Sequence, residues 1–386
     1  MPQRALKHSP SSHRIGKQDR VHNALRGQIV QGRLRAGQQL PPIPVLARQL
    51  GVSGNTIQLA IIHLVREGFV EVVPRKGTFV RQQLPQTRYG LVFFNDPTAP
   101  SWSGYYVALA NAALSLEREQ GYELDFFYGV DGRSDSADAQ RLEDSVRAHR
   151  LSGLIFANNP PYPTGLPVLD AHGLPLVAIM SGRLMPEVAA VVVDGERLYE
   201  RALDHLLARG CRRIATISNY FAPGSGEDRG RAVAARGLAV PSYWWQYAQS
   251  TQPSAVRNCV ELLMHSAAGD RPDGLIITDD NLVEHSLAGL IAAGVRVPQD
   301  VEVVVHCNFP WAPPCVLPVK RIGFDIVATL RTCVGLIERQ RQGESVPSST
   351  VVPPIFEEEL VRPAAPPRGW DQSALAPGPT GLVAAH

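Results

Sequence analysis

The sequence predicts an α/β protein in which a small winged helix-turn-helix unit precedes a larger, doubly wound domain with parallel sheets. Three observations lead to this prediction. Residues 19–81 read as three short helices followed by a two-stranded hairpin. From residue 89 onward, short apolar strands alternate with helices, which is typical of buried parallel sheet. The chain of 386 residues also exceeds what one hydrophobic core usually serves, so more than one domain is expected.

The N-terminal unit follows from its capping and turn residues. Its first helix begins near Asp19 and ends before Gly32, and a short second helix, IPVLARQLG, ends at Gly51. Ser53 is placed to cap the third helix, because its hydroxyl oxygen can accept from an unpaired N–H group of the first turn. Two strands around the turn PRKG complete the unit.

The third helix is the candidate recognition helix. Its apolar residues recur at helical spacing, which predicts a buried stripe made of Ile57, Ile61, Leu64 and Val65. The helix carries neither Lys nor Arg before Arg66. A contact with nucleic acid at this helix would therefore come mainly from polar, uncharged side chains.

Charge divides the chain into two parts. Residues 1–88 hold 14 Lys and Arg against 3 Asp and Glu, whereas the remainder holds 24 against 33. A basic unit joined to an acidic one indicates that only the first part meets a polyanion. We expect residues 1–18 to form a disordered basic arm and residues 82–88 to form a polar linker.

The second part is expected to span residues 89–361, followed by a disordered tail at 362–386 that is rich in Pro, Ala and Gly. Helices are expected between most of its strands, over 104–120, 136–149, 196–209, 254–268 and 281–293. The expected strands cover 89–94, 122–129, 151–158, 174–180, 189–194, 212–218, 273–278 and 301–307.

Several classes of protein are disfavoured by the sequence. No apolar run approaches the ~18 residues needed to span a bilayer, and the N-terminus lacks the apolar core of a secretory signal. The five cysteines are odd in number and lack CxxC spacing. Neither a GxSxG motif nor a phosphate-binding GKS ending is present. We therefore expect a cytoplasmic protein that is not an enzyme, with no catalytic residues, no metal site and no cofactor.

The N-terminal unit resembles the DNA-binding domain of GntR-type bacterial transcription regulators. The shared pattern is a Gly-x-Leu-x-x-Gly-x-x-Leu-Pro entry, a Leu-Gly-Val-Ser turn and a Gly-Thr-Phe-Val wing, all present within residues 28–81. The resemblance implies a winged helix that binds double-stranded DNA. At the three places where relatives have basic residues, this chain has Pro44, Gly54 and Gln58.

The second part resembles the effector domain of LacI-type regulators, which is similar to periplasmic sugar-binding proteins. The resemblance rests on ALDHLLARGCRRIATIS and on DGLIITDDNLVEHSLAGLIAAGVRVPQDVEVVVHCN. It implies a two-lobed sensor with crossovers near 218–222 and 308–320. Lobe 1 is then expected to comprise about 89–218 and 316–338, and lobe 2 about 222–308 and 339–361.

Candidate DNA contacts follow from the helix-turn-helix and from the wing. Asn55 and Gln58 can pair with adenine edges, and Ser53 and Thr56 can bond phosphates near the helix N-terminus. Basic or close-approach residues of the second helix and of the wing complete the set, namely Arg48, Arg75, Lys76 and Gly77.

Candidate ligand contacts follow from the ends of the predicted strands, because ligands of such folds bind at the carboxyl ends of parallel strands. Polar and aromatic side chains there suit a sugar. The strand ends and the resemblance together select Asp96, Trp102, Asp194, Tyr220, Arg229, Asp279 and Asn308. Asp194 and Asp280 can instead be helix caps. An Asn at 308, where relatives have Asp, also leaves a purine or another small polar metabolite open.

The sequence thus predicts a homodimeric, ligand-responsive regulator, with repression expected by family analogy. The alternative is a ligand sensor whose winged helix no longer binds DNA specifically.

Overall fold

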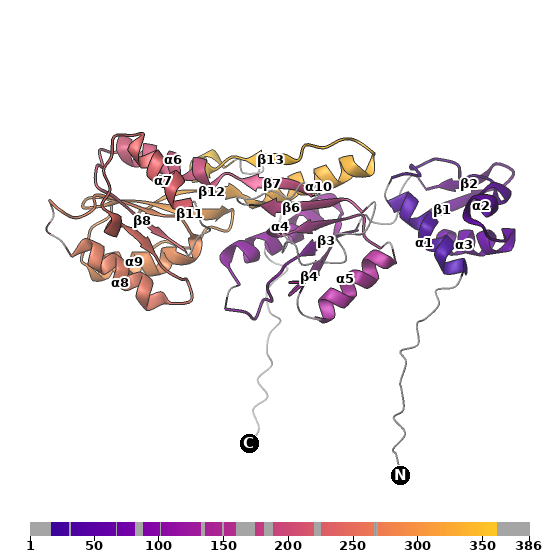
Figure 1. The fold of residues 1–386 in the computed structure, drawn as a ribbon, viewed down its shortest axis with the longest axis horizontal. Helices are drawn as coiled ribbons and strands as arrows, with labels where there is room; N and C mark the ends of the chain where they lie inside the picture. The colour runs from indigo at the N-terminus through magenta and orange to yellow at the C-terminus, as the bar shows by residue number, and fades with distance from the viewer. Residues whose placement is uncertain are drawn as a thin grey trace, which may run out of the picture.

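The computed structural model describes residues 17–360, apart from 31, 67, 82–87, 101, 133–135, 149, 160–173, 181–187, 220–224, 266 and 268. The predicted tail lies outside these residues, as do nearly all of the predicted basic arm and linker. Figure 1 shows three compact units in a row, which we call the head, lobe 1 and lobe 2. None of the described helices is long and apolar enough to cross a lipid bilayer.

The head is a winged helix-turn-helix, as predicted. It consists of α1 (Lys17–Val30), α2 (Ile43–Leu50), α3 (Gly54–Arg66), β1 (Val70–Val73) and β2 (Gly77–Val80). Ser53 caps α3 as expected, because the Thr56 amide donates to its hydroxyl oxygen over 3.2 Å. The predicted stripe is correct for three residues, since Ile57, Ile61 and Leu64 are buried. It is wrong for Val65, which is 37% exposed.

Lobe 1 is built around a parallel sheet. Its strand order is β13-β7-β6-β5-β3-β4. Helices α4 (Gly104–Gln120) and α10 (Ile326–Arg341) cover one face and α5 (Ala137–Arg147) covers the other. The strands are β3 (Arg88–Val92), β4 (Glu123–Phe127), β5 (Gly153–Phe156), β6 (Leu176–Met180), β7 (Ala189–Val193) and β13 (Ser349–Val352).

Lobe 2 repeats this architecture with strand order β14-β12-β11-β10-β8-β9. Helices α6 (Gly195–Ala208) and α7 (Ser225–Ala234) lie on one face, and α8 (Pro253–Met264) and α9 (Val283–Ala292) on the other. The strands are β8 (Ile214–Ser218), β9 (Trp245–Tyr247), β10 (Gly274–Ile277), β11 (Glu302–Phe309), β12 (Lys320–Asp325) and β14 (Ile355–Phe356), the last antiparallel to β12.

The predicted division between the lobes is wrong in detail. β8 was expected in lobe 1, but it pairs with β10 and therefore belongs to lobe 2. β12 pairs with β11 in lobe 2, whereas β13, which was expected in lobe 2, pairs with β7 in lobe 1. The chain consequently crosses between the lobes at 193–195, 325–326 and 352–355. The lobe to which a strand belongs is decided by the strand with which it pairs. The sequence does not show this, because a strand has the same sequence pattern in either sheet.

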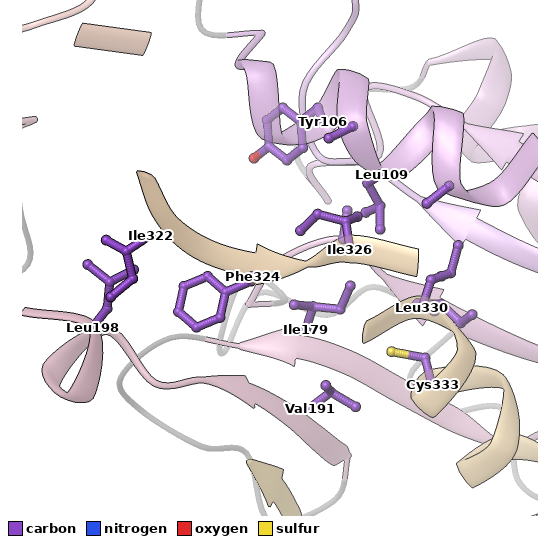
Figure 2. Packing of buried hydrophobic residues seen from close by; sticks show 14 of the residues in the cluster. Tyr106, Leu109, Ile179, Val191, Leu198, Ile322, Phe324, Ile326, Leu330 and Cys333 are labelled. Atoms are coloured by element: carbon purple, nitrogen blue, oxygen red, sulfur yellow. The ribbon is translucent and has the colours of Figure 1, made fainter. Parts of the chain in front are cut away.

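The crossovers are packed with apolar side chains. One buried cluster contains residues of both lobes, including Leu198 of α6, Ile322 of β12, Leu109 of α4 and Leu330 of α10. Figure 2 shows Ile322 beside Leu198, with Phe324 continuing the row toward lobe 1. The cluster therefore continues across the boundary between the lobes.

Candidate ligand cavity and DNA-binding head

A cavity of about 540 Å³ lies at the carboxyl ends of strands from both lobes. Lobe 1 contributes residues after β5 and from the first turns of α4. Lobe 2 contributes residues after β8, β9 and β10 and from the end of β11. This is where the fold class places ligands, and the volume suits a small molecule. The polar lining comprises Ser103, Tyr105, Tyr106, Asn158, Asn159, Asn219, Gln249, Ser250, Thr251, Thr278, Asp279, Asp280, Asn281, His306 and Asn308.

Two residues of the predicted ligand set line this cavity. Asp279 follows β10, and its carboxylate accepts from the Asn281 amide over 2.9 Å and from Asn219 Nδ2 over 3.1 Å. Asn308 lies near the end of β11 and is only 2% exposed. Its Nδ2 donates to Asp280 Oδ2 over 2.7 Å.

The sequence allows Asp280 to be a helix cap, but in the structure its side chain lines the cavity. Burial raises the pKa of its carboxyl group, and the neighbouring charge of Asp279 raises it further. His306 and the hydrogen bond from Asn308 oppose this shift. A donor or a positive charge brought close to Asp280 would therefore stabilise its ionised form.

Three other predicted ligand residues have different roles in this structure. Asp194 caps α6, since the Arg197 amide donates to its carboxylate over 2.9 Å. Asp96 is exposed, and its carboxylate accepts a hydrogen bond from the amide of Thr98 within the same turn. Trp102 packs against Phe93, with ring centroids 5.3 Å apart. None of the three lines the described cavity.

The remaining two predicted residues are Arg229 and Tyr220. Arg229 lies behind the cavity, with Nη1 donating to Ser218 Oγ over 2.6 Å and its guanidinium 5.6 Å from the ring centroid of Tyr199. Burial lowers the pKa of Arg229. Tyr220 lies outside the described residues.

Sequence reasoning did not select the lobe 1 wall of the cavity. Asn158 Nδ2 donates to the Tyr106 hydroxyl over 2.9 Å, which leaves Asn158 Oδ1 as the atom available to a ligand. The Tyr105 hydroxyl donates to the carbonyl oxygen of Ala157 over 2.7 Å. Asn158 Oδ1 and His306 Nδ1 are buried and have no hydrogen-bond partner among the described residues. Asn158 is the last residue of the predicted strand 151–158, and Tyr105 lies at the start of the predicted helix 104–120. Their positions in the sequence do not give the directions of their side chains.

The two lobes touch directly beside the cavity. The amide of Gly104, the first residue of α4 in lobe 1, donates to Asn281 Oδ1 of lobe 2 over 2.8 Å. A Cβ atom at position 104 would lie 2.8 Å from Asp280 Oδ2. This close approach joins the first turn of α4 to the acidic wall of lobe 2.

The head presents a polar first turn on α3. Asn55 and Gln58 are exposed, so both are free to reach base edges. Ser53 and Thr56 are engaged with each other, their hydroxyl oxygens 2.8 Å apart. Beyond this turn the exposed face becomes apolar, with Leu59 38% and Ile62 40% exposed.

The wing tip carries the positive charge. Arg75 and Lys76 are exposed, and Arg75 adopts a left-handed backbone with φ 63°. Gly77 has φ 122°, and a Cβ there would lie 2.5 Å from Gln39 Nε2, so its role in this structure is to close the turn. Arg48 is exposed on α2, with Nε 3.4 Å from the carbonyl oxygen of Pro44.

Comparison with known proteins matches two parts of the chain. Residues 17–80 match the family of bacterial regulatory proteins of the gntR type. Residues 203–358 match the periplasmic binding protein-like domain. The first match coincides with the head. The second covers most of lobe 2 together with α10 and β13 of lobe 1.

Relatives with both parts are also found. The chain is 25% identical over 294 residues to an arabinose metabolism transcriptional repressor of Geobacillus stearothermophilus, covering 74% of this chain and 80% of the relative. It is 23% identical to a repressor of the same name from Halalkalibacterium halodurans, covering 88% and 94%. A LacI family transcriptional regulator from Lactobacillus casei, solved with bound glucose, matches 70% of this chain and 98% of its own, with 20% identity and a TM-score of 0.52.

Proposed function

Because the chain joins a GntR-type DNA-binding domain to a periplasmic-binding-protein-like domain, we propose that it is a transcription regulator controlled by a small polar metabolite. The head binds operator DNA, and the cavity between the lobes binds the metabolite, with a sugar as the first candidate. Repressors of arabinose metabolism are among its relatives, which supports repression as the mode of action. Regulation of transcription in the cytoplasm, and not an enzymatic reaction, is the activity that we propose.

The observation that carries this proposal is the cavity itself. It combines the carboxylates of lobe 2 and amide groups of both lobes with the rings of Tyr105 and Tyr106. Hydroxyl groups of a sugar need hydrogen-bond partners in fixed positions, and its C–H faces pack on aromatic rings. A ligand held by both lobes binds one interlobe arrangement more tightly than others, and so shifts the equilibrium between them.

We further propose that the protein acts as a homodimer. Two-fold symmetry would present two heads to two half-sites about one helical turn apart. A change in the arrangement of the lobes would then alter the spacing of the heads through residues 82–88, the predicted linker. The domain limits proposed from the sequence, 19–81 for the head and 89–361 for the sensor, define the parts that move.

A second function is favoured by one observation on the head. Positions 44, 54 and 58 lack the basic residues expected of relatives, and α3 exposes Leu59 and Ile62. A head of this kind could have lost specific DNA binding, which would leave a ligand sensor alone. Measuring operator binding decides between the two functions.

We expect Asn55→Ala and Asp279→Ala to separate the two activities. Asn55→Ala should reduce the preference for operator over unrelated DNA by roughly 5- to 150-fold, because one base contact contributes about 1–3 kcal/mol. Asp279→Ala should abolish the response of operator binding to a sugar while leaving the affinity for operator unchanged. Gel shifts on the chain's own promoter region, with and without arabinose, ribose and glucose, measure both. Equal loss of both activities in either variant would contradict this division.

The wing makes a second, quantitative prediction. Each phosphate contact contributes about 0.9 to the slope of log K against log salt. The double variant Arg75→Ala/Lys76→Ala should therefore reduce the slope by about 2 and weaken binding to operator and unrelated DNA alike. Arg147→Ala/Arg257→Ala removes the same charge from exposed helices of the sensor and serves as the control. An unchanged slope in the wing variant would place DNA elsewhere on the head.

A further inference from the structure

On the basis of the proposed function, we propose that the cavity binds uncharged or cationic polyhydroxy compounds and rejects anionic ones such as sugar acids and sugar phosphates. The charge of the lining comes first. Asp279 and Asp280 place two adjacent carboxylates in the lobe 2 wall. Among the described residues that line the cavity, neither Lys nor Arg is present to balance them.

The neighbouring donors are already engaged. Asn219 Nδ2 and Asn281 Nδ2 donate to the carboxylate of Asp279, over 3.1 and 2.8 Å. Asn308 Nδ2 donates to Asp280. These amide hydrogens would otherwise be suitable partners for a ligand carboxylate or phosphate. Because they serve the aspartates instead, these hydrogens are not available to a ligand anion.

Among the described residues, the opposite wall offers one unpaired acceptor. The hydrogen bond from Asn158 Nδ2 to the Tyr106 hydroxyl fixes the amide of Asn158, so Oδ1 is the atom left without a partner in the described part of the chain. An unpaired buried acceptor is unfavourable, and a ligand hydroxyl or ammonium group that reaches it removes this cost. A carboxylate or phosphate has no hydrogen to donate to it.

Two features would favour an anion: the N-terminus of α4, which carries a partial positive charge, and His306, which lines the cavity and whose buried Nδ1 has no hydrogen-bond partner in the described part of the chain. His306 interacts with the carboxylate of Asp280. Two groups of lobe 2 already compensate the helix end. The Gly104 amide donates to Asn281 Oδ1, and Asp280 Oδ2 lies so close that a Cβ at 104 would be only 2.8 Å from it. The Gly104 amide is therefore not available to a ligand anion, and Asp280 already places a negative charge beside the helix end.

The raised pKa of Asp280 agrees with this assignment. Burial and the charge of Asp279 already disfavour a second negative charge at this wall. A ligand anion would add to the same repulsion, whereas a hydroxyl or ammonium group would relieve it.

Calorimetric titration of the full chain with matched compounds tests the proposal. The sets are built on arabinose, ribose and glucose, each compared with its sugar acid and its phosphate, and glucose also with glucosamine. We expect at least one neutral sugar or glucosamine to bind, and its acid and phosphate to bind at least about 100-fold more weakly, because like charges at short range repel strongly. Equal or tighter binding of an acid or a phosphate would overturn the proposal.

The carboxylates are then tested directly. Asp279→Asn/Asp280→Asn should reduce the discrimination against the matched acid at least about tenfold, because the repulsion between like charges is removed. Asp270→Asn is the control, since Asp270 is exposed and precedes β10. It therefore lies at the amino end of that strand, whereas the cavity lies at the carboxyl ends. Thermal unfolding checks that each variant is folded, and Asp280→Asn alone serves if the double variant is not. Unchanged discrimination in a folded variant would also overturn the proposal.

Gel shifts separate this proposal from the proposed function. If a sugar acid or phosphate binds and releases the operator, the charge preference is wrong while the regulator remains. If the operator is bound but no compound of the sets binds the sensor, the preference is overturned and the sensing half of the proposed function fails with it. If no operator is bound while a neutral sugar binds selectively, the preference holds and the role in transcription fails.

Discussion

Replacing Gly323 by alanine should strongly destabilise the sensor, although the change adds only one methyl group. Gly323 lies in β12 and pairs with Cys307 of β11. A Cβ atom there would lie 1.7 Å from the carbonyl oxygen of Cys307 and 2.6 Å from its carbonyl carbon. Both are backbone atoms in the middle of a paired strand, so neither can move without breaking the ladder.

Overpacking of a core typically costs about 1–3 kcal/mol, and a backbone clash of this kind belongs at or above the upper end. We expect the free energy of unfolding to fall by more than about 3 kcal/mol, a large share of the stability of a typical domain. For a domain of this size, that loss corresponds to a decrease in Tm of about 10 °C. Differential scanning calorimetry measures it, and loss of soluble protein would be the extreme form of the same result.

Gly335→Ala is the matched control. Gly335 is exposed on α10, and an added Cβ would meet no atom within 4 Å. Alanine in a helix interior is favoured over glycine by roughly 0.5–1 kcal/mol, so this variant should be slightly more stable than the wild type. If both variants unfolded at the wild-type temperature, β11 and β12 would have to approach less closely than the structure places them.

The head could be predicted closely from sequence because its signals are local. Gly51 takes the left-handed conformation that ends α2, and Ser53 accepts the amide that begins α3. Neither contact depends on the rest of the fold. Val65 was the exception, because the direction it faces is decided by how α3 packs on α1.

The elements missed in the sensor have weaker local signals. β12 has the sequence KRIGFD, in which charged residues and a glycine replace the apolar run of the other strands. α10 contains Gly335 and several β-branched residues, which lower helix propensity, and its stability comes from packing on α4 and the lobe 1 sheet. Assignment of β8 and β13 to a lobe depends on pairing with strands far away in the chain, which sequence patterns do not specify.

The cavity was predictable as a place and less so as a set of residues. Asn158 and Asp280 lie at or just after the ends of predicted strands, and both line it. Asp194 stands at an equivalent strand end, yet its carboxylate caps α6. The choice between capping and lining depends on side-chain direction, which the sequence of a strand end leaves open.

Replacing Gly104 by alanine should weaken ligand binding without unfolding the protein. Gly104 is the first residue of α4, where alanine is compatible with the helical backbone. The added Cβ would instead meet the other lobe, 2.8 Å from Asp280 Oδ2 and 3.5 Å from Asn281 Oδ1. Asp280 is held by Asn308 and Asn281, so its carboxylate cannot simply rotate away.

The contact between Gly104 and Asn281 joins the two lobes beside the cavity. A clash at this contact should therefore destabilise the arrangement in which both lobes hold the ligand. An overpacking cost of about 1–3 kcal/mol on that arrangement corresponds to roughly 5- to 150-fold weaker binding. Calorimetric titration with arabinose, ribose or glucose, whichever binds the wild type, measures this loss. Operator affinity in the absence of sugar should stay unchanged, because the head does not contact this position.

Gly195→Ala separates the interlobe contact from a general effect on helix starts. Gly195 is the first residue of α6 and follows the cap Asp194, just as Gly104 follows Ser103. An added Cβ at 195 meets no atom within 4 Å, so sugar affinity should stay at the wild-type value. Equal affinity in both variants would mean that the ligand is held with the lobes further apart than they lie in this structure. Tighter binding by Gly104→Ala would instead place the contact between Gly104 and Asn281 in the sugar-free protein.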